Sequence, residues 1–190
     1  MEIADFGAVE GVHWRSAEEV GAFIERQGIA SLLAFDGERC VGQLYLKAYD
    51  PDFQEPGGWT GNRPWADFAI AEPLDLAGRP LTVGCFHVGR SPDGAADPSV
   101  RGRGVGTALL RAAVEWAGSH PSCDGLLTWG LVAGAAGLHE WAGQLSHATY
   151  RRFGFREIAR VSDPRLEKEL AGVDLTGAEE DPAVMRVMLL

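Results

Sequence analysis

Apolar and polar residues change their spacing several times along the chain, and each change predicts a different element. From 16 to 28 the apolar residues recur every three or four positions, which predicts an amphipathic helix that ends at Gly28. Two alternating runs follow on either side of Asp36 and Gly37, a pair that favours a tight turn between antiparallel strands. The pattern therefore predicts a helix followed by a β-hairpin over residues 29–49.

The middle of the chain predicts a strand, a glycine-rich loop, a helix and a second strand. Residues 81–89 are apolar enough for a buried strand, and residues 125–132 form another short apolar run. Between them a helix begins near Gly104, with apolar residues at helical spacing on one face. This order is that of a βαβ crossover, so we expect its two strands to be parallel.

The last third of the chain predicts one more helix and two more strands. Helical spacing of apolar residues covers 138–152, and the runs at 155–161 and 184–190 predict strands. Between the two strands, residues 162–182 carry seven acidic residues, which favours a loop with room for a short helix.

Residues 50–80 differ from the rest because they contain five prolines, too many for central strands. A segment of this length predicts an insertion in the fold. No internal repeat or linker divides the chain, so we expect one domain over residues 1–190.

The composition narrows the class of protein. The 190 residues are 46% hydrophobic and 23% charged, which is typical of a soluble globular domain. A net charge of -10 opposes binding to nucleic acid or to an anionic membrane, because both need a cationic face. The histidines and the three cysteines show no metal-ligand spacing, so no metal site is predicted. Without a leader or a long apolar stretch, we expect a cytoplasmic protein.

The glycine-rich loop before the middle helix has the composition of a phosphate-binding loop. Gly102, Gly104 and Gly106 precede a helix start, where backbone amides without internal acceptors favour an anion. Arg101 and Arg103 add positive charge in an otherwise acidic chain. The alternative is a solvated turn whose glycines only reverse the chain.

Two common phosphate-binding motifs fit this loop poorly, and a third fits well. The Walker loop lacks its lysine, because Thr107 directly follows Gly106, and the dinucleotide fingerprint lacks its third glycine. The spacing Arg101-x-x-Gly104-x-Gly106 resembles the R/Q-x-x-G-x-G/A signature of the GNAT superfamily of N-acetyltransferases, which binds the pyrophosphate of acetyl-CoA. Downstream, "TYRRFGF" at 149–155 resembles that family's "LYEKLGF"-type ending.

This resemblance implies a single-domain α/β fold. Its central sheet would be mixed and mostly antiparallel, with one parallel crossover and flanking helices. The resemblance also implies acetyl-CoA as the cofactor, bound by the helix start and by the end of the preceding strand. The residues that would bind it are Phe86, His87, Val88, Gly89, Arg101, Gly102, Arg103, Gly104, Val105, Gly106 and Thr107.

Two residues are candidates for proton transfer. Tyr150 matches the tyrosine that the family commonly uses as a general acid toward the departing thiolate, and a phenol with a pKa of about 10 suits that task. The alternative for Tyr150 is a packed ring whose hydroxyl reaches solvent. His87 could accept a proton from the attacking amine, and the alternative is a histidine hydrogen-bonded within the sheet.

The expected reaction is acetyl transfer from acetyl-CoA to a primary amine on a small molecule. Two alternatives stay open: transfer to a protein or peptide amine, and an acyl-CoA-binding module without turnover. Exposed strand edges are compatible with a homodimer. One stretch has no counterpart in the family signature, the polar segment "RSPDGAADPSV" at 90–100 that leads into the glycine loop.

Overall fold

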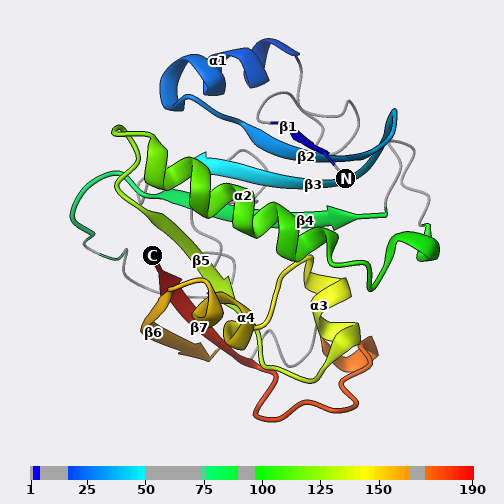
Figure 1. Ribbon diagram of the computed structural model, residues 1–190. Helices are drawn as coiled ribbons and strands as arrows, with labels where there is room; N and C mark the ends of the chain where they lie inside the picture. The colour runs from blue at the N-terminus through cyan, green and yellow to red at the C-terminus, as the bar shows by residue number, and fades with distance from the viewer. Residues whose placement is uncertain (1, 5–16, 50–73, 75, 90–96, 163–169) are drawn as a thin grey trace. The chain divides into compact units, whose positions relative to one another are not determined.

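The computed structural model describes residues 2–4, 17–49, 74, 76–89, 97–162 and 170–190 (Figure 1). Most of the predicted insertion at 50–80 therefore lies outside the described residues. In chain order the elements are β1 (Glu2–Ala4), α1 (Ala17–Gln27), β2 (Ser31–Asp36), β3 (Arg39–Ala48), β4 (Leu81–Val88), η2 (Pro98–Val100), α2 (Val105–Ser119), β5 (Leu126–Gly130), α3 (Ala136–Ala142), α4 (His147–Arg152), β6 (Arg156–Ser162), η3 (Leu170–Gly172) and β7 (Val184–Leu189).

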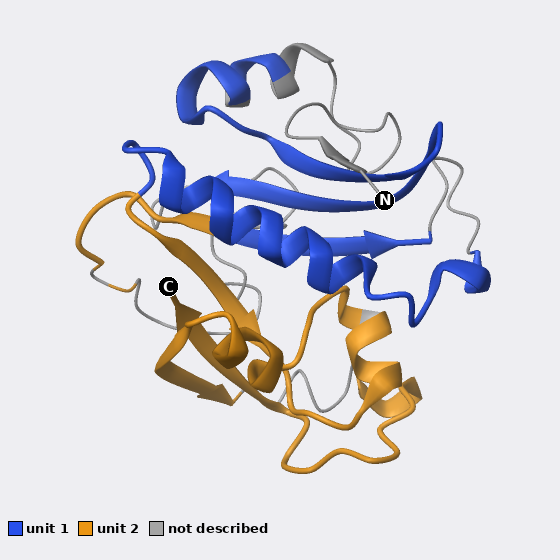
Figure 2. Ribbon diagram, viewed as in Figure 1, with its two compact units in different colours: residues 1–47, 83–123 blue, residues 48–82, 124–190 orange. Residues whose placement is uncertain are grey.

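Contacts divide the chain into two compact units, shown in Figure 2. The first unit comprises residues 1–47 and 83–123, and the second comprises 48–82 and 124–190. Strand β4 begins in the second unit and continues into the first. The expectation of one domain over 1–190 stays a prediction.

The first unit is built on strands in the order β1, β2, β3, β4. The β2–β3 hairpin is antiparallel and pairs Asp36 with Arg39 across its turn, as the Asp-Gly pair predicts. Helix α2 runs along these strands (Figure 1) and packs closely on β3 at Gly42. A Cβ at Gly42 would lie 2.6 Å from Cγ1 of Val105 and 3.3 Å from Cδ1 of Leu109. The helix that carries the glycine loop at its start is therefore fixed against the sheet.

The second unit contains the parallel strand pair of the predicted crossover. Leu81 and Thr82 at the start of β4 pair in parallel with Leu126 and Leu127 of β5, and α2 lies between the two strands in sequence. Strand β7 pairs antiparallel with both β5 and β6. Together with the antiparallel β1–β2 and β2–β3 pairs, this arrangement confirms the mixed α/β sheet that the sequence predicts.

The sequence predicts one helix at 138–152, and this is wrong in one respect: the structure has two helices there. Gly143 adopts a left-handed backbone, with φ of +59°, and ends α3 there. Ser146 then begins α4 as its N-cap, since its hydroxyl oxygen accepts a hydrogen bond from the Thr149 amide at 3.2 Å. Strand β1 was not predicted either. In the acidic segment 162–182, the described part contains one short helix, η3.

The core of the second unit holds α4 directly on β5. A Cβ at Gly130 would lie 2.7 Å from Cα of His147, so only glycine allows this close approach. Tyr150, one turn further along α4, is thereby buried against the sheet. Within the described ranges, no helix has the length and apolar character needed to cross a membrane.

Candidate functional site

The glycine loop leads into α2 through a backbone that suits an anion. Gly104 is the N-cap of the helix in a left-handed conformation, with φ of +78° and ψ of 14°. The Ala108 amide donates to the Gly104 carbonyl at 2.9 Å, so the amides of Val105, Gly106 and Thr107 precede the hydrogen-bonded part of the helix. A Cβ on Gly104 would meet nothing within 4 Å, which leaves space beside these donors. The positive end of the 15-residue helix dipole lies there too.

The polar segment that the family signature does not require has a structural role at its described end. Asp97 caps the short helix η2, because its Oδ1 accepts hydrogen bonds from the Ser99 amide at 2.9 Å and the Ser99 hydroxyl at 2.6 Å. The Asp97 amide donates to the Gly89 carbonyl, and the Gly89 amide donates to the Val41 carbonyl at 3.0 Å. The segment thus ties the start of the glycine loop to the end of β4 and to β3.

The Asp97 carboxylate stays ionised across the pH range of ordinary assays. Hydrogen bonds from Ser99 and the ion pair with Arg39 lower its pKa to about 2. The link between Arg39 on the β2–β3 hairpin and the segment before the loop therefore does not titrate near neutral pH.

The end of β4 contributes the other residues expected to contact a cofactor. Phe86 is buried, and His87 and Val88 are partly exposed. Gly89 has φ of +67°, and a Cβ there would lie 2.6 Å from the Asp97 carbonyl oxygen. The amide and the carbonyl of Gly89 both form hydrogen bonds within the chain. At this strand end, we therefore expect Phe86, His87 and Val88 to make the contacts with the cofactor.

The two arginines of the loop belong to the same unit as the strand end. Arg103 forms an ion pair with Asp36, which ends β2, at 2.9 Å. No spacing rule predicts this contact, because the two residues are 67 positions apart. Arg101, Arg103 and residues 86–89 are thus brought into one unit with the helix start.

Tyr150 belongs to the second unit and lies on α4 with its side chain fully buried. Its hydroxyl donates to Oε1 of Gln144 at 2.7 Å and accepts from the Thr128 hydroxyl at 3.3 Å. Its ring packs edge-on against Phe155, with centroids 5.2 Å apart. The expected alternative, a hydroxyl that reaches solvent, does not describe this side chain. Gln144 and Thr128 are polar partners that the sequence analysis missed.

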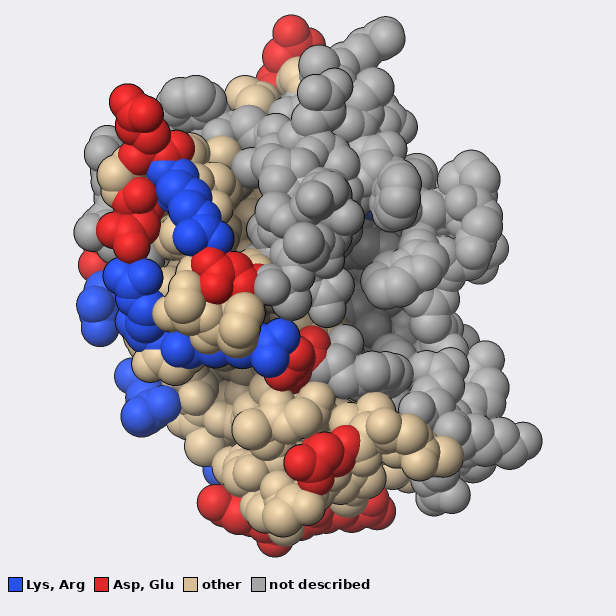
Figure 3. Space-filling view, turned by 90° about the vertical axis from the view of Figure 1, so that its right-hand side faces the viewer, with Lys and Arg blue, Asp and Glu red and all other residues tan. Residues whose placement is uncertain are grey.

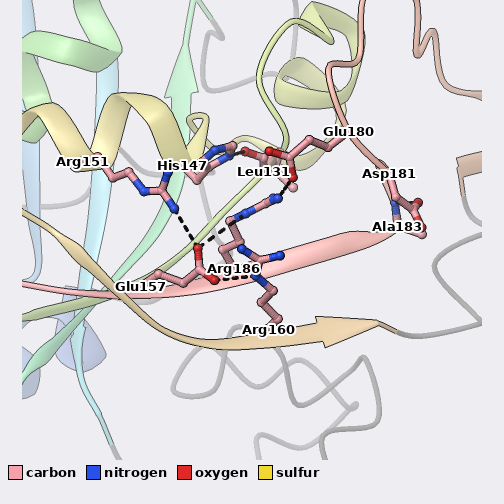
Figure 4. A network of polar contacts seen from close by, with 9 residues as sticks. All are labelled: Leu131, His147, Arg151, Glu157, Arg160, Glu180, Asp181, Ala183 and Arg186. Carbon is pink, nitrogen blue, oxygen red and sulfur yellow. Dashed lines mark hydrogen bonds and ion pairs between the residues drawn. The ribbon is translucent and has the colours of Figure 1, made fainter.

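A network of charged residues joins α4 to the last two strands of the second unit (Figure 4). Glu157 on β6 accepts from Arg151 of α4 at 2.9 Å and from Arg160 at 2.5 Å, and lies 3.6 Å from Arg186 on β7. Arg186 is 2% exposed and also pairs with Glu180. The hydrogen bond from Arg160, with the nearby arginines, lowers the pKa of Glu157. This network fixes the helix that carries Tyr150.

His147 at the start of α4 is buried beside this network, and its Nδ1 bonds to the Leu131 carbonyl oxygen at 2.9 Å. Burial lowers its pKa, and the charges of Arg186 and Arg151 act in the same direction, against the Leu131 hydrogen bond and Glu157.

The lowered pKa of His147 predicts a loss of stability in mild acid. Below the usual histidine pKa of about 6.5, the unfolded chain takes up a proton at His147 more readily than the folded chain does. The free energy of unfolding therefore decreases as the pH is lowered. Thermal melts between about pH 7.5 and 5.5 should therefore show a smaller drop in Tm for His147→Gln than for wild type. An equal drop in both proteins would contradict this contribution.

The described residues contain no group of three histidine, cysteine or acidic side chains placed to hold a metal ion.

Comparison with solved structures shows the fold. Arylalkylamine N-acetyltransferase 7 of the yellow fever mosquito Aedes aegypti, as that structure is described, aligns with a TM-score of 0.51 at 19% identity, covering 91% of this chain and 69% of its own. NAA60 of Arabidopsis thaliana in complex with acetyl-CoA aligns at 0.47 and 15% identity, covering 93% and 84%. An acetyltransferase of Bacillus subtilis in complex with CoA aligns at 0.45 and 16% identity, covering 92% and 83%. No curated protein sequence shows significant similarity to the chain.

The sequence profile of the Acetyltransferase (GNAT) family matches residues 8–155, well over half of the chain. The matched range includes the hairpin, the whole glycine loop with α2, the parallel crossover and the tyrosine of α4. The resemblance carried by the loop and by the segment at 149–155 is thus confirmed, and the chain belongs to the acetyltransferase (GNAT) family.

Proposed function

We propose that this chain is an N-acetyltransferase that takes acetyl from acetyl-CoA and transfers it to the primary amine of a small molecule. The observation that carries the proposal is the Arg101–Thr107 loop, whose signature glycine caps a 15-residue helix with open space beside the amides. Because Gly104 has no side chain, the space beside these amides stays open for a phosphate group. Family membership supports the same reaction class.

When bound, acetyl-CoA supplies an acetyl group activated as a thioester. The amides of Val105, Gly106 and Thr107 would bind its pyrophosphate oxygens, with Arg101 and Arg103 adding charge. An amide among Phe86, His87 and Val88 would donate to the thioester carbonyl, an interaction whose loss in other enzymes costs about 10²–10³ in rate. His87 would accept the proton of the amine, and Tyr150 would donate its proton to the thiolate.

The role of Tyr150 carries a structural condition. Its hydroxyl is buried and donates to Gln144, at the junction between α3 and α4. To act as the acid, Tyr150 would have to give up this hydrogen bond to Gln144 and donate its proton to the thiolate instead.

A small-molecule amine as acceptor is supported by the mosquito protein, which shares the fold and is described as an arylalkylamine N-acetyltransferase. The direct test is a thiol-release assay on the purified chain with acetyl-CoA and separate panels of arylalkylamines, free-N-terminus peptides and lysine peptides. We expect release that depends on a small amine. Release with peptides alone would favour the protein-directed alternative. Tight acetyl-CoA binding without turnover on any panel would favour the non-catalytic module.

A further inference from the structure

Two ion pairs of opposite polarity join the tip of the β2–β3 hairpin to the glycine loop of the first unit. In one, the hairpin supplies the acid, Asp36, and the loop supplies Arg103, at 2.9 Å. In the other, the hairpin supplies the base, Arg39, and the segment before the loop supplies Asp97. Figure 3 shows basic side chains gathered on one side of a face, with acidic side chains directly beside them. The loop arginine is thus held by a carboxylate of the chain itself.

The two pairs differ in what else binds the acid. Asp97 accepts two further hydrogen bonds from Ser99, which keep its carboxylate in place as a cap. For Asp36 the contact with Arg103 joins two exposed side chains, with exposed fractions of 50% and 54%. Exposed pairs of this kind are weak and salt-dependent. Both arginines are exposed, but the Asp97 carboxylate is only 26% exposed and is held by Ser99, whereas the Arg103 pair can open at little cost.

The position of Arg103 places it among groups suited to phosphate. It lies between Gly102 and Gly104, and a Cβ on either glycine would meet nothing within 4 Å. A guanidinium makes the same fork of hydrogen bonds with a carboxylate and with a phosphate. A phosphate that enters the loop would therefore compete directly with Asp36 for Arg103.

We propose that the Asp36 carboxylate occupies the place of a phosphate at Arg103 and is exchanged for a coenzyme A phosphate on binding. This inference rests on the proposed function, because it takes the loop to be the phosphate site. Asp36 then lowers the affinity for the cofactor. Breaking its ion pair with Arg103 offsets part of the free energy gained from the new contact between Arg103 and the phosphate. Asp36 has no proposed role in the chemical step, so we expect its substitution to change cofactor binding and to leave the rate of that step unchanged.

The test is isothermal titration of CoA into wild type, Asp36→Asn, Glu38→Gln and Arg103→Gln. Asp36→Asn should bind CoA about two- to fivefold more tightly than Glu38→Gln, which is the range expected for release of an exposed ion pair. Glu38→Gln is the matched control because it removes the same charge from the same hairpin turn. Arg103→Gln should weaken binding about tenfold, and adding Asp36→Asn to it should give no gain beyond that of Glu38→Gln.

A second ligand identifies which phosphate replaces the carboxylate. If the gain from Asp36→Asn persists with 3′-dephospho-CoA, the phosphate belongs to the pyrophosphate, and if the gain disappears, it is the 3′-phosphate.

An equal effect of Asp36→Asn and Glu38→Gln, or a gain that survives in Arg103→Gln, would overturn the exchange. Thermal melts confirm that each variant is folded. Wild type that binds no CoA would overturn the proposed function itself, and a wild type that binds while Asp36→Asn is unchanged would overturn this inference alone.

Discussion

Gly104→Val is expected to weaken acetyl-CoA binding at least about a hundredfold while the chain stays folded. The left-handed backbone at Gly104, with φ of +78°, disfavours any L side chain and especially a β-branched one. The new side chain would also fill the space beside the first amides of α2, where a phosphate would bind. Loss of two charge-assisted hydrogen bonds, each worth about 1.5–3 kcal/mol, is enough for this change in affinity.

The control for backbone strain is Gly37→Val. Gly37 also has a positive φ, of +63°, and its added Cβ would meet nothing within 4 Å, but it lies in the hairpin turn. Both variants should lose a similar free energy of unfolding, roughly 1–2 kcal/mol. Isothermal titration should then show a large loss for Gly104→Val only. If both bind acetyl-CoA as wild type does, the phosphate assignment of the loop is wrong.

The parts of the fold that could be predicted from sequence are those set by local rules. The Asp-Gly turn at 36–37 specifies the hairpin, and the order of strand, loop, helix and strand specifies the parallel crossover. The break between α3 and α4 follows local rules as well, since Gly143 and Ser146 are common terminators and caps. It was missed because the apolar spacing continues across the break.

What could not be predicted depends on contacts between distant positions. Asp36 and Arg103 are 67 residues apart, and Arg39 and Asp97 are 58 apart, so no spacing rule joins them. The burial of Tyr150 is of the same kind, because it follows from the close contact of α4 with Gly130. The motif at 149–155 identifies the tyrosine but carries no information about the partners of its hydroxyl. Those partners decide how its role can be tested.

Tyr150→Phe is expected to lower kcat about a hundredfold or more and to leave acetyl-CoA affinity unchanged. The variant keeps the ring that packs on Phe155 and removes the only proton that the side chain can give up. Loss of a general acid costs about 10²–10⁴ in rate. The hydroxyl also donates to buried Gln144, so the variant should lose about 1–3 kcal/mol of stability as well. Rate measurements must therefore be made well below its melting temperature.

Gln144→Met separates the two effects of that substitution. It removes the acceptor of the same 2.7 Å hydrogen bond, so its loss of stability should match that of Tyr150→Phe, but the phenol proton remains. If Tyr150 is the general acid, kcat measured by thiol release should fall far more for Tyr150→Phe than for Gln144→Met. If the two variants lose activity equally, the hydroxyl acts only by holding the junction between α3 and α4 in place. Tyr150 would then be a core residue of the second unit, and the thiolate would take its proton from another source.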